Sequence, residues 1–322
     1  MARLKSVSIH QLSGVVSGTT LTFSPLFNVI LGREGSGHRD LLKLLGAILC
    51  ADFSHLDGQV FDVECVMLTS QGELPIRIQR LSSEDEIEIR HGDTAHPLDA
   101  VPDQRPLSAE ILSPEWSLLD GLTAPDGDPG AIREPRWIPD PILLQGLRSG
   151  PGPVEVDARY IPELSSVWYH LDYEKAWLTC DHVSQERIGR LGFRFRRSDD
   201  AMVGLDAYDA EKRRLLSMFY YVACRRDVAL LDGMLNRIEE EAAGDLIKSL
   251  LHRQTFVTNT ESRLLYQLSF PSAAAMRHAC ILCNRRDSGD VEWRAMSEAE
   301  AKKLYQFYDA GLKHIEDLAR LW

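Results

Sequence analysis

The segment 32–40 carries the pattern with the clearest chemical meaning. It reads Gly-Arg-Glu-Gly-Ser-Gly-His-Arg-Asp, follows an apolar run at 27–31 and precedes a leucine-rich segment at 40–49. A strand, a glycine-rich turn and a helix are the context in which the sequence G-x-x-x-x-G-K-[ST] binds phosphate through backbone amides. His38 and Arg39 stand where that pattern has its lysine and its hydroxyl residue. The segment therefore predicts a loop with the glycine spacing of a phosphate-binding loop but without its lysine and its hydroxyl residue.

The two replacements change what such a loop can do. A histidine is mostly neutral near pH 7, whereas a lysine is charged. An arginine has hydrogen-bond donors but no lone pair, so Arg39 cannot ligate Mg²⁺ as a serine or threonine does. Two readings follow. Either the loop is an empty relic that is retained for folding, or its amides and Arg39 bind an anion or a nucleotide without magnesium.

A further candidate residue lies where a strand ends in the C-terminal half. Asp232 closes an apolar strand that is predicted at 228–232, and it is either a relic that bonds to nearby backbone or a magnesium ligand. Together with the loop it completes a vestigial nucleotide- or anion-binding set, which consists of Gly32, Gly35, Ser36, Gly37, His38, Arg39 and Asp232.

In their order along the chain, these elements resemble the ATP-binding-cassette heads of the SMC, RecF and OLD-like ATPases. The resemblance covers an opening hairpin, the loop and a meander at the front, and the segment 203–322 at the back. It implies an α/β fold of the P-loop NTPase type: a mixed sheet with flanking helices, an antiparallel β-meander and a proline-rich insertion. It also implies a dimerisation surface formed by the P-loop and the signature helix.

The chain departs from the pattern of these ATPases at each motif. Where relatives carry a Leu-Ser-x-Gly-Glu signature, the stretch 207–211 reads Ala-Tyr-Asp-Ala-Glu. A glycine follows the Walker B aspartate in place of an acidic residue, and a threonine stands where a γ-phosphate-sensing histidine is expected. The degenerate signature and switch residues are Tyr208, Asp209, Ala210, Glu211, Gly233 and Thr260. Because phosphoryl transfer needs charge stabilisation, magnesium and an oriented water together, these losses predict that no catalytic residue remains.

The rest of the chain predicts one composite domain in three parts. Residues 1–96 form an N-terminal lobe, with strands at 4–9, 21–23, 27–31, 60–67, 76–81 and 86–90 and a helix at 40–49. Residues 97–162 hold twelve of the fifteen prolines and predict a long loop or a linker without central strands. Residues 163–322 form a helical and C-terminal lobe. Its predicted elements are a helical pattern at 161–188, helices at 208–223, 239–252, 297–308 and 312–322, and strands at 228–232 and 255–258.

The net charge of the chain bears on whether it binds nucleic acid. The chain has 322 residues and a formal net charge of −12, which argues against a surface that coats DNA. One basic stretch is the exception, and its Arg-Phe-Arg alternation is typical of one face of a strand. This stretch is either a solvated strand face or a nucleic-acid or partner patch, formed by Arg187, Arg190, Arg194, Arg196 and Arg197.

The cysteines and the apolar segments indicate in which cellular compartment the protein is expected. The six cysteines are scattered singly except for Cys280 and Cys283, so we expect buried free thiols, with half of a zinc site as the alternative. No second Cys/His pair accompanies these two, so no metal is expected. No run is long and apolar enough to span a bilayer, and the start of the chain reads as a strand instead of a signal peptide. We therefore expect a cytoplasmic protein that does not contact a membrane.

These observations predict a non-catalytic, ABC-type pseudo-ATPase that scaffolds or regulates a protein complex in DNA maintenance or phage defence. The expected partner is a second copy, or an ATPase or effector protein in a heterodimer, and nucleic acid is expected mainly through that partner. No cofactor is expected, and ATP with Mg²⁺ is the alternative. The alternative functions are a slow or partner-completed ATPase, and a nucleic-acid-binding module that uses the stretch Arg187–Arg197.

Overall fold

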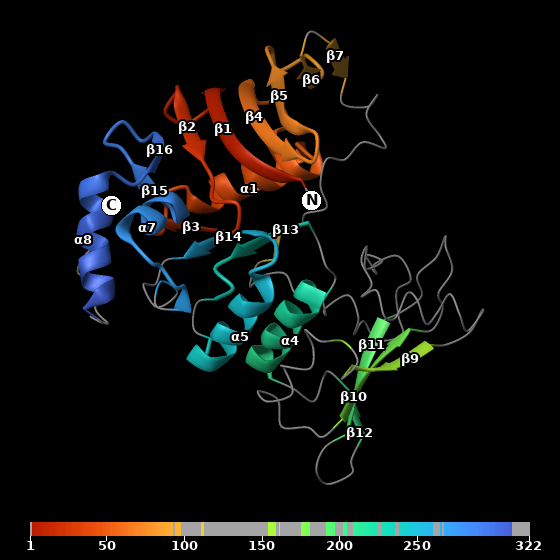
Figure 1. Cartoon of the computed structure of the whole chain (residues 1–322). Helices are drawn as coiled ribbons and strands as arrows, with labels where there is room; N and C mark the ends of the chain where they lie inside the picture. The colour runs from red at the N-terminus through yellow and green to blue at the C-terminus, as the bar shows by residue number, and fades with distance from the viewer. Residues whose placement is uncertain are drawn as a thin grey trace. The chain divides into compact units, whose positions relative to one another are not determined.

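The computed structural model of the chain divides into two compact units (Figure 1). Unit 1 comprises Met1–Ile111, Arg226–Arg237 and Leu250–Trp322, and unit 2 comprises Leu112–Arg225 and Ile238–Ser249. Within these units the structure describes residues 2–92, 94–97, 111–112, 154–158, 161, 175–180, 191–196, 202–204, 209–223, 227–235, 238–259, 265 and 267–310.

The first sheet of unit 1 is antiparallel. Its strands are β1 (Arg3–Leu12), β2 (Thr19–Thr22), β4 (Phe61–Thr69), β5 (Gly72–Arg80), β6 (Glu88–His91) and β7 (Thr94–Pro97). They lie in the order β2-β1-β4-β5-β6-β7. β1 and β2 form the opening hairpin, and β4 to β7 follow one another as an antiparallel meander. The predicted hairpin and meander are therefore confirmed.

The second sheet of unit 1 is mixed. Its strands are β3 (Phe27–Gly32), β8 (Ile111–Leu112), β13 (Val228–Asp232), β14 (Gln254–Asn259), β15 (Cys280–Arg285) and β16 (Val291–Ala295), in the order β16-β15-β3-β14-β13-β8. β15, β3, β14 and β13 run parallel, and β16 returns antiparallel to β15. Because parallel strands end at the same edge of a sheet, the ends of β3, β13 and β14 meet there. This edge carries the glycine-rich loop.

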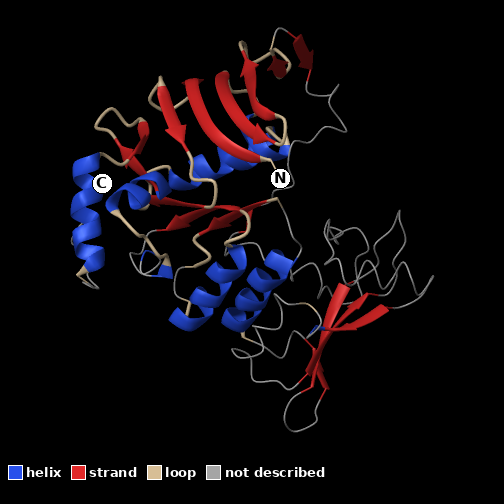
Figure 2. Cartoon of the chain, viewed as in Figure 1, coloured by secondary structure: helices blue, strands red, loops and turns tan. Residues whose placement is uncertain are grey.

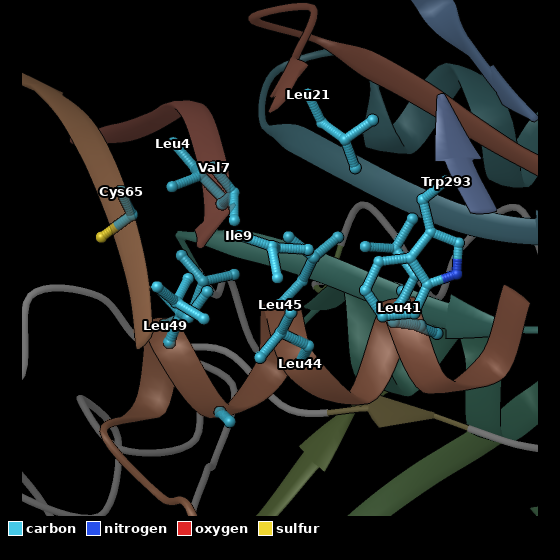
Figure 3. Packing of buried hydrophobic residues seen from close by; sticks show 14 of the residues in the cluster. Leu4, Val7, Ile9, Leu21, Leu41, Leu44, Leu45, Leu49, Cys65 and Trp293 are labelled. Atoms are coloured by element: carbon cyan, nitrogen blue, oxygen red, sulfur yellow. The ribbon is translucent and has the colours of Figure 1, made fainter. Parts of the chain in front are cut away.

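Helix α1 (His38–Cys50) fills the core of unit 1 and confirms the helix that the leucine spacing predicts. Figure 3 shows its leucines among side chains of the first sheet, such as Val7 and Ile9, and beside Trp293 of β16. Residues of β13 and β14, including Leu230 and Phe256, belong to the same cluster. Each such buried leucine contributes about 2 kcal/mol through burial of apolar surface. The helix that follows the loop is thus fixed between two sheets.

A buried glutamine joins the two sheets by hydrogen bonds. Gln254, the first residue of β14, accepts a bond from the Leu4 amide at 2.8 Å and donates one to the Leu4 carbonyl at 2.7 Å. Its side-chain amide also donates to the carbonyl of Ser24 at 2.9 Å. Gln254 is 1% exposed and both of its bonds to Leu4 are buried, so water does not take its place at the Leu4 backbone.

Further helices of unit 1 lie within the described residues. They are the 3₁₀ helix η1 (Ser54–Leu56), α7 (Ala273–Ala279) and α8 (Glu298–Asp309). Ser297 caps α8 in a reciprocal arrangement with Glu300, which explains why the predicted helix starts there. α7 has only seven residues and no predicted counterpart. The helix predicted at 312–322 lies outside the described residues. Among the described helices, none is long and apolar enough to cross a membrane.

Within the described residues, unit 2 contains an antiparallel sheet and two helices (Figure 2). Its elements are β9 (Val154–Asp157), β10 (Lys175–Cys180), β11 (Leu191–Arg196), β12 (Met202–Gly204), α4 (Ala210–Ala223) and α5 (Glu240–Leu250). The strands lie in the order β12-β11-β10-β9. α4 and α5 confirm the helices predicted at 208–223 and 239–252, and β11 confirms the strand that the Arg-Phe-Arg alternation predicts.

The helical pattern predicted at 161–188 is wrong over the residues of β10. This strand pairs with β9 on one side and with β11 on the other, from Lys175↔Arg196 to Cys180↔Leu191. Aromatic and β-branched residues such as Trp177 and Thr179 favour such a pleated surface, and the partner strands decide the outcome. In the proline-rich segment the structure describes β8 and β9, both at sheet edges. Most of that segment lies outside the described residues.

The glutamine bridge yields a stability prediction. We expect Gln254→Leu to lower the free energy of unfolding by about 2–4 kcal/mol, because it removes both hydrogen bonds to the buried backbone of Leu4. The Ser24 carbonyl keeps the bond from the side-chain amide of Asn28 at 3.0 Å. Gln11→Leu makes the same change at an exposed position of β1 and is expected to shift stability by about 0.5 kcal/mol or less. Urea unfolding of both variants measures the difference. Equal effects would show that the bridge does not hold the sheets together.

Candidate functional site

The glycine-rich loop connects the end of β3 to the start of α1, and three of its glycines are required by geometry. Gly35 and Gly37 both have φ of 78°, where a side chain is strained. A Cβ on Gly32 would collide with Ser36 Oγ and would lie 3.0 Å from Cys283 Cβ. The backbone and the packing of the loop therefore favour glycine at these three positions.

The hairpin of β15 and β16 holds this loop from outside. Arg285 Nε donates to the carbonyl of Gly35 at 2.9 Å, and Trp293 Nε1 donates to the carbonyl of Gly37 at 3.1 Å. Val291 packs against Gly37 so closely that a Cβ there would lie 2.6 Å from Val291 Cγ1. These contacts come from the protein itself, so the loop keeps its shape without a bound phosphate.

His38 is buried at the first position of α1. Its Nδ1 lies 3.2 Å from the Oγ of Ser36. Burial lowers the pKa of His38 below its usual value, and the neighbouring charge of Arg39 lowers it further, against the opposing effect of Asp232. The side chain is therefore neutral at pH 7. A P-loop lysine would supply a permanent positive charge at this position.

Arg39 and Asp232 form an ion pair across the edge of the sheet. Arg39 Nε lies 3.3 Å from Asp232 Oδ2, and the Arg39 side chain is half exposed, whereas that of Asp232 is 12% exposed. The other carboxylate oxygen, Oδ1, accepts a hydrogen bond from Thr258 Oγ1 at 2.6 Å. The Thr258 hydroxyl in turn accepts from the amide of Gly233 at 2.8 Å. Both oxygens of Asp232 are thus engaged by protein groups.

Gly233 has a backbone conformation that suits glycine. Its φ is 61°, in the left-handed region that other residues rarely adopt. A glutamate at this position would have to adopt that strained conformation or shift the backbone that bonds to Thr258. The position after Asp232 therefore has no carboxylate and no conformation that readily accepts one.

The predicted site residues are divided between the two units. The loop residues, Asp232 and Gly233 all belong to unit 1. The predicted signature residues belong to unit 2, where Asp209 caps α4 by accepting from the Lys212 amide at 2.8 Å and Ala210 and Glu211 form its first turn. Tyr208 and Thr260 lie outside the described residues.

The basic stretch is described only in part. Arg194 and Arg196 both belong to β11, two positions apart. Arg187, Arg190 and Arg197 lie outside the described residues. The other candidate site, at Cys280 and Cys283, consists of buried thiols in β15. Burial raises the pKa of Cys280 to about 12. In the part of the chain that the structure describes, no group of three or more His, Cys, Asp or Glu side chains could hold a metal ion.

Sequence reasoning missed three groups that shape the site. Thr258 lies opposite Asp232 in the parallel register of β13 and β14, so strand-end alignment could have found it. Arg285 and Trp293 contact the loop from far along the chain and carry no motif. No local signal in the sequence identifies them.

Comparison with known proteins identifies the fold. No protein-family model and no curated protein matches the sequence. An SMC head bound to the C-winged helix domain of ScpA matches with a TM-score of 0.61 and 13% identity, over 92% of this chain and 99% of that chain. The SMC head domain from Thermotoga maritima matches with a TM-score of 0.57 and 11% identity, over 92% and 99%. The recombination mediator protein RecF with ATP matches with a TM-score of 0.51 and 12% identity, over 88% and 97%.

The chain therefore has a mixed α/β, P-loop NTPase fold of the ABC type. It is structurally similar to the ATPase heads of SMC proteins and RecF, and the fold predicted from its residues is confirmed. Because the sequence identities are low, these similarities establish the fold but not the activity of the chain.

Two glycines of the loop offer a matched test of its packing. Gly35→Ala and Gly37→Ala place a methyl group on the same backbone conformation, but only the second methyl meets Val291. We expect a cost of about 1–2 kcal/mol from strain in both variants and about 1–3 kcal/mol more in Gly37→Ala from overpacking. Urea unfolding of the two variants gives the difference. Equal losses would contradict the close contact between the loop and β16.

The pKa of His38 predicts a pH dependence of stability. Because that pKa is lowered in the folded protein, the unfolded chain takes up this proton first as the pH falls below about 6.5. His38 should therefore cost stability in acid and cost nothing above that range. We expect His38→Gln to lose less stability than the wild type between pH 8 and pH 5, in paired urea titrations. An NMR titration midpoint of His38 above 6.5 would contradict the burial argument.

Proposed function

We propose that this chain is a non-catalytic, ABC-type pseudo-ATPase that acts as a scaffolding or regulatory subunit of a protein complex. The observation that carries the proposal is Gly233. It stands where an ATPase of this fold needs a carboxylate to position water, and its left-handed φ disfavours any side chain. A head without that carboxylate has the fold of an ATPase but not the group that activates the nucleophile.

The other two requirements of phosphoryl transfer fail at the same site. Charge on the γ-phosphate needs a cation, but His38 is buried and neutral in the lysine position. Magnesium needs oxygen ligands, but Arg39 offers only donors, and it already pairs with Asp232. The three losses affect charge, metal and water separately, so restoring one of them would not restore catalysis.

The proposed partners follow from the fold. ATPase heads of this kind act in assemblies, and one of the similar SMC heads is bound to a domain of ScpA. We infer that this chain forms a homodimer, or a heterodimer with an active ATPase or an effector protein, in DNA maintenance or phage defence. With a net charge of −12, it would reach nucleic acid mainly through that partner.

A second candidate function is a nucleotide site that a partner completes. It is favoured by the loop, which keeps the left-handed glycines that direct backbone amides towards an anion at the start of α1. A structure of similar fold, RecF, is known with ATP. In this alternative the partner supplies the missing acid and the missing lysine.

The primary proposal predicts the absence of ATP turnover. We expect the purified chain to hydrolyse ATP with Mg²⁺ no faster than its Asp232→Ala variant, because the site lacks a water-positioning carboxylate. A coupled assay for released phosphate measures both proteins. Turnover that Asp232→Ala abolishes would contradict the proposal.

The same phosphate-release assay distinguishes the two candidate functions, a scaffold and a partner-completed nucleotide site, once a partner has been co-purified. Hydrolysis by the complex that falls when His38 or Arg39 is mutated in this chain would favour the completed site. Hydrolysis that is unchanged by these substitutions would favour a scaffold beside an independent ATPase.

A further inference from the structure

We propose that the guanidinium of Arg39 is a built-in cation that replaces a divalent metal ion beside Asp232, and that this site therefore excludes Mg²⁺. In P-loop NTPases the residue at position 39 would be a serine or threonine that holds Mg²⁺ together with the strand-end aspartate. The inference deepens the proposed function and rests on it, because it explains how the site persists without nucleotide and metal.

The carboxylate of Asp232 needs a cation beside it. Asp232 closes a buried strand of a parallel sheet, and its side chain is 12% exposed. A carboxylate with so little access to water is costly unless an opposite charge or several donors stabilise it. The Thr258 hydroxyl, at 2.6 Å from Oδ1, is one neutral donor. Arg39 supplies the positive charge at the other oxygen, Oδ2.

The guanidinium of Arg39 fits beside Asp232, whereas a Mg²⁺ ion does not. Mg²⁺ requires a nearly octahedral set of oxygen ligands at close range. The guanidinium has five donors and no lone pair, so residue 39 cannot be one of those ligands. Asp232 Oδ2 lies 3.3 Å from Arg39 Nε, so a divalent ion at this oxygen would also face a positive charge at close range. The residues present therefore do not fit Mg²⁺.

The fold fixes the backbone at position 39. It is the second residue of α1, whose leucines are buried between the two sheets. Gly37, the residue before α1, is held by Trp293 of β16. The backbone that presents Arg39 to Asp232 is therefore set by the core. A smaller side chain at position 39 would leave the carboxylate in place and remove its counter-charge.

The test is metal binding without nucleotide, with Mn²⁺ as the probe. We expect Asp232→Asn to leave the Mn²⁺ binding of the wild type unchanged, since the site binds none. In Arg39→Ser, which removes the cation and adds a hydroxyl, we expect Mn²⁺ to bind at least about tenfold more tightly than to the wild type. The double variant Arg39→Ser/Asp232→Asn should lose that gain. Electron paramagnetic resonance of free Mn²⁺ measures each affinity, and competition with Mg²⁺ shows that both ions use the site.

Two controls make the comparison specific. Arg33→Ser makes the same arginine-to-serine change at an exposed position of the same loop and should bind Mn²⁺ as the wild type does. Arg39→Lys keeps a cation beside Asp232 and should also gain nothing. Asparagine is chosen at position 232 because its side-chain carbonyl can still accept from Thr258.

The inference is overturned if the wild type binds Mn²⁺ through Asp232, or if folded Arg39→Ser binds it no better than the double variant. Should Arg39→Ser fail to fold, the Mn²⁺ affinities of the wild type and of Asp232→Asn still test the inference, because a weaker affinity in Asp232→Asn would show that the wild type binds the ion through Asp232. Metal binding by the wild type without ATP turnover would refute this inference and leave the non-catalytic proposal standing. ATP turnover that depends on Asp232 would refute the non-catalytic proposal itself.

Discussion

The carboxylate of Asp232 is the constraint on which the arrangement of the site depends. It ends a buried strand at the edge where β3, β13 and β14 finish. Its negative charge has little contact with water there, so protein groups must stabilise it. Arg39 provides that stabilisation from α1, and Thr258 provides it from the neighbouring strand. A helix and two strands are thereby tied together at one carboxylate. In an active NTPase the nucleotide and its metal ion contribute to the same junction.

The loop shows a similar independence from a ligand. Backbone carbonyls of Gly35 and Gly37 accept from Arg285 and Trp293, and Val291 closes against the second glycine. A phosphate-binding loop that is held from outside by a hairpin can remain folded when it binds nothing. The P-loop frame therefore serves as a packing element between the sheet and α1.

The sequence predicted those parts of the site whose signals are local. Glycine spacing and periodic leucines gave the loop and α1, and an apolar run ending in a carboxylate gave Asp232. The contacts of Arg285 and Trp293 with the loop span 250 and 256 residues, and no local pattern encodes them. The helix predicted at 161–188 is wrong over β10. The spacing of its aromatic residues is compatible with a helix face and also with a strand, and pairing with β11 favours the strand.

The conformation of Gly233 also bears on how the chain could change over evolutionary time. A substitution that restored an acidic residue there would add a side chain to a backbone with φ of 61° before any catalytic benefit existed. The benefit would further require a lysine at position 38 and a hydroxyl at position 39. No single step improves the site, and the first of them lowers stability. The backbone conformation thus favours keeping a glycine at position 233.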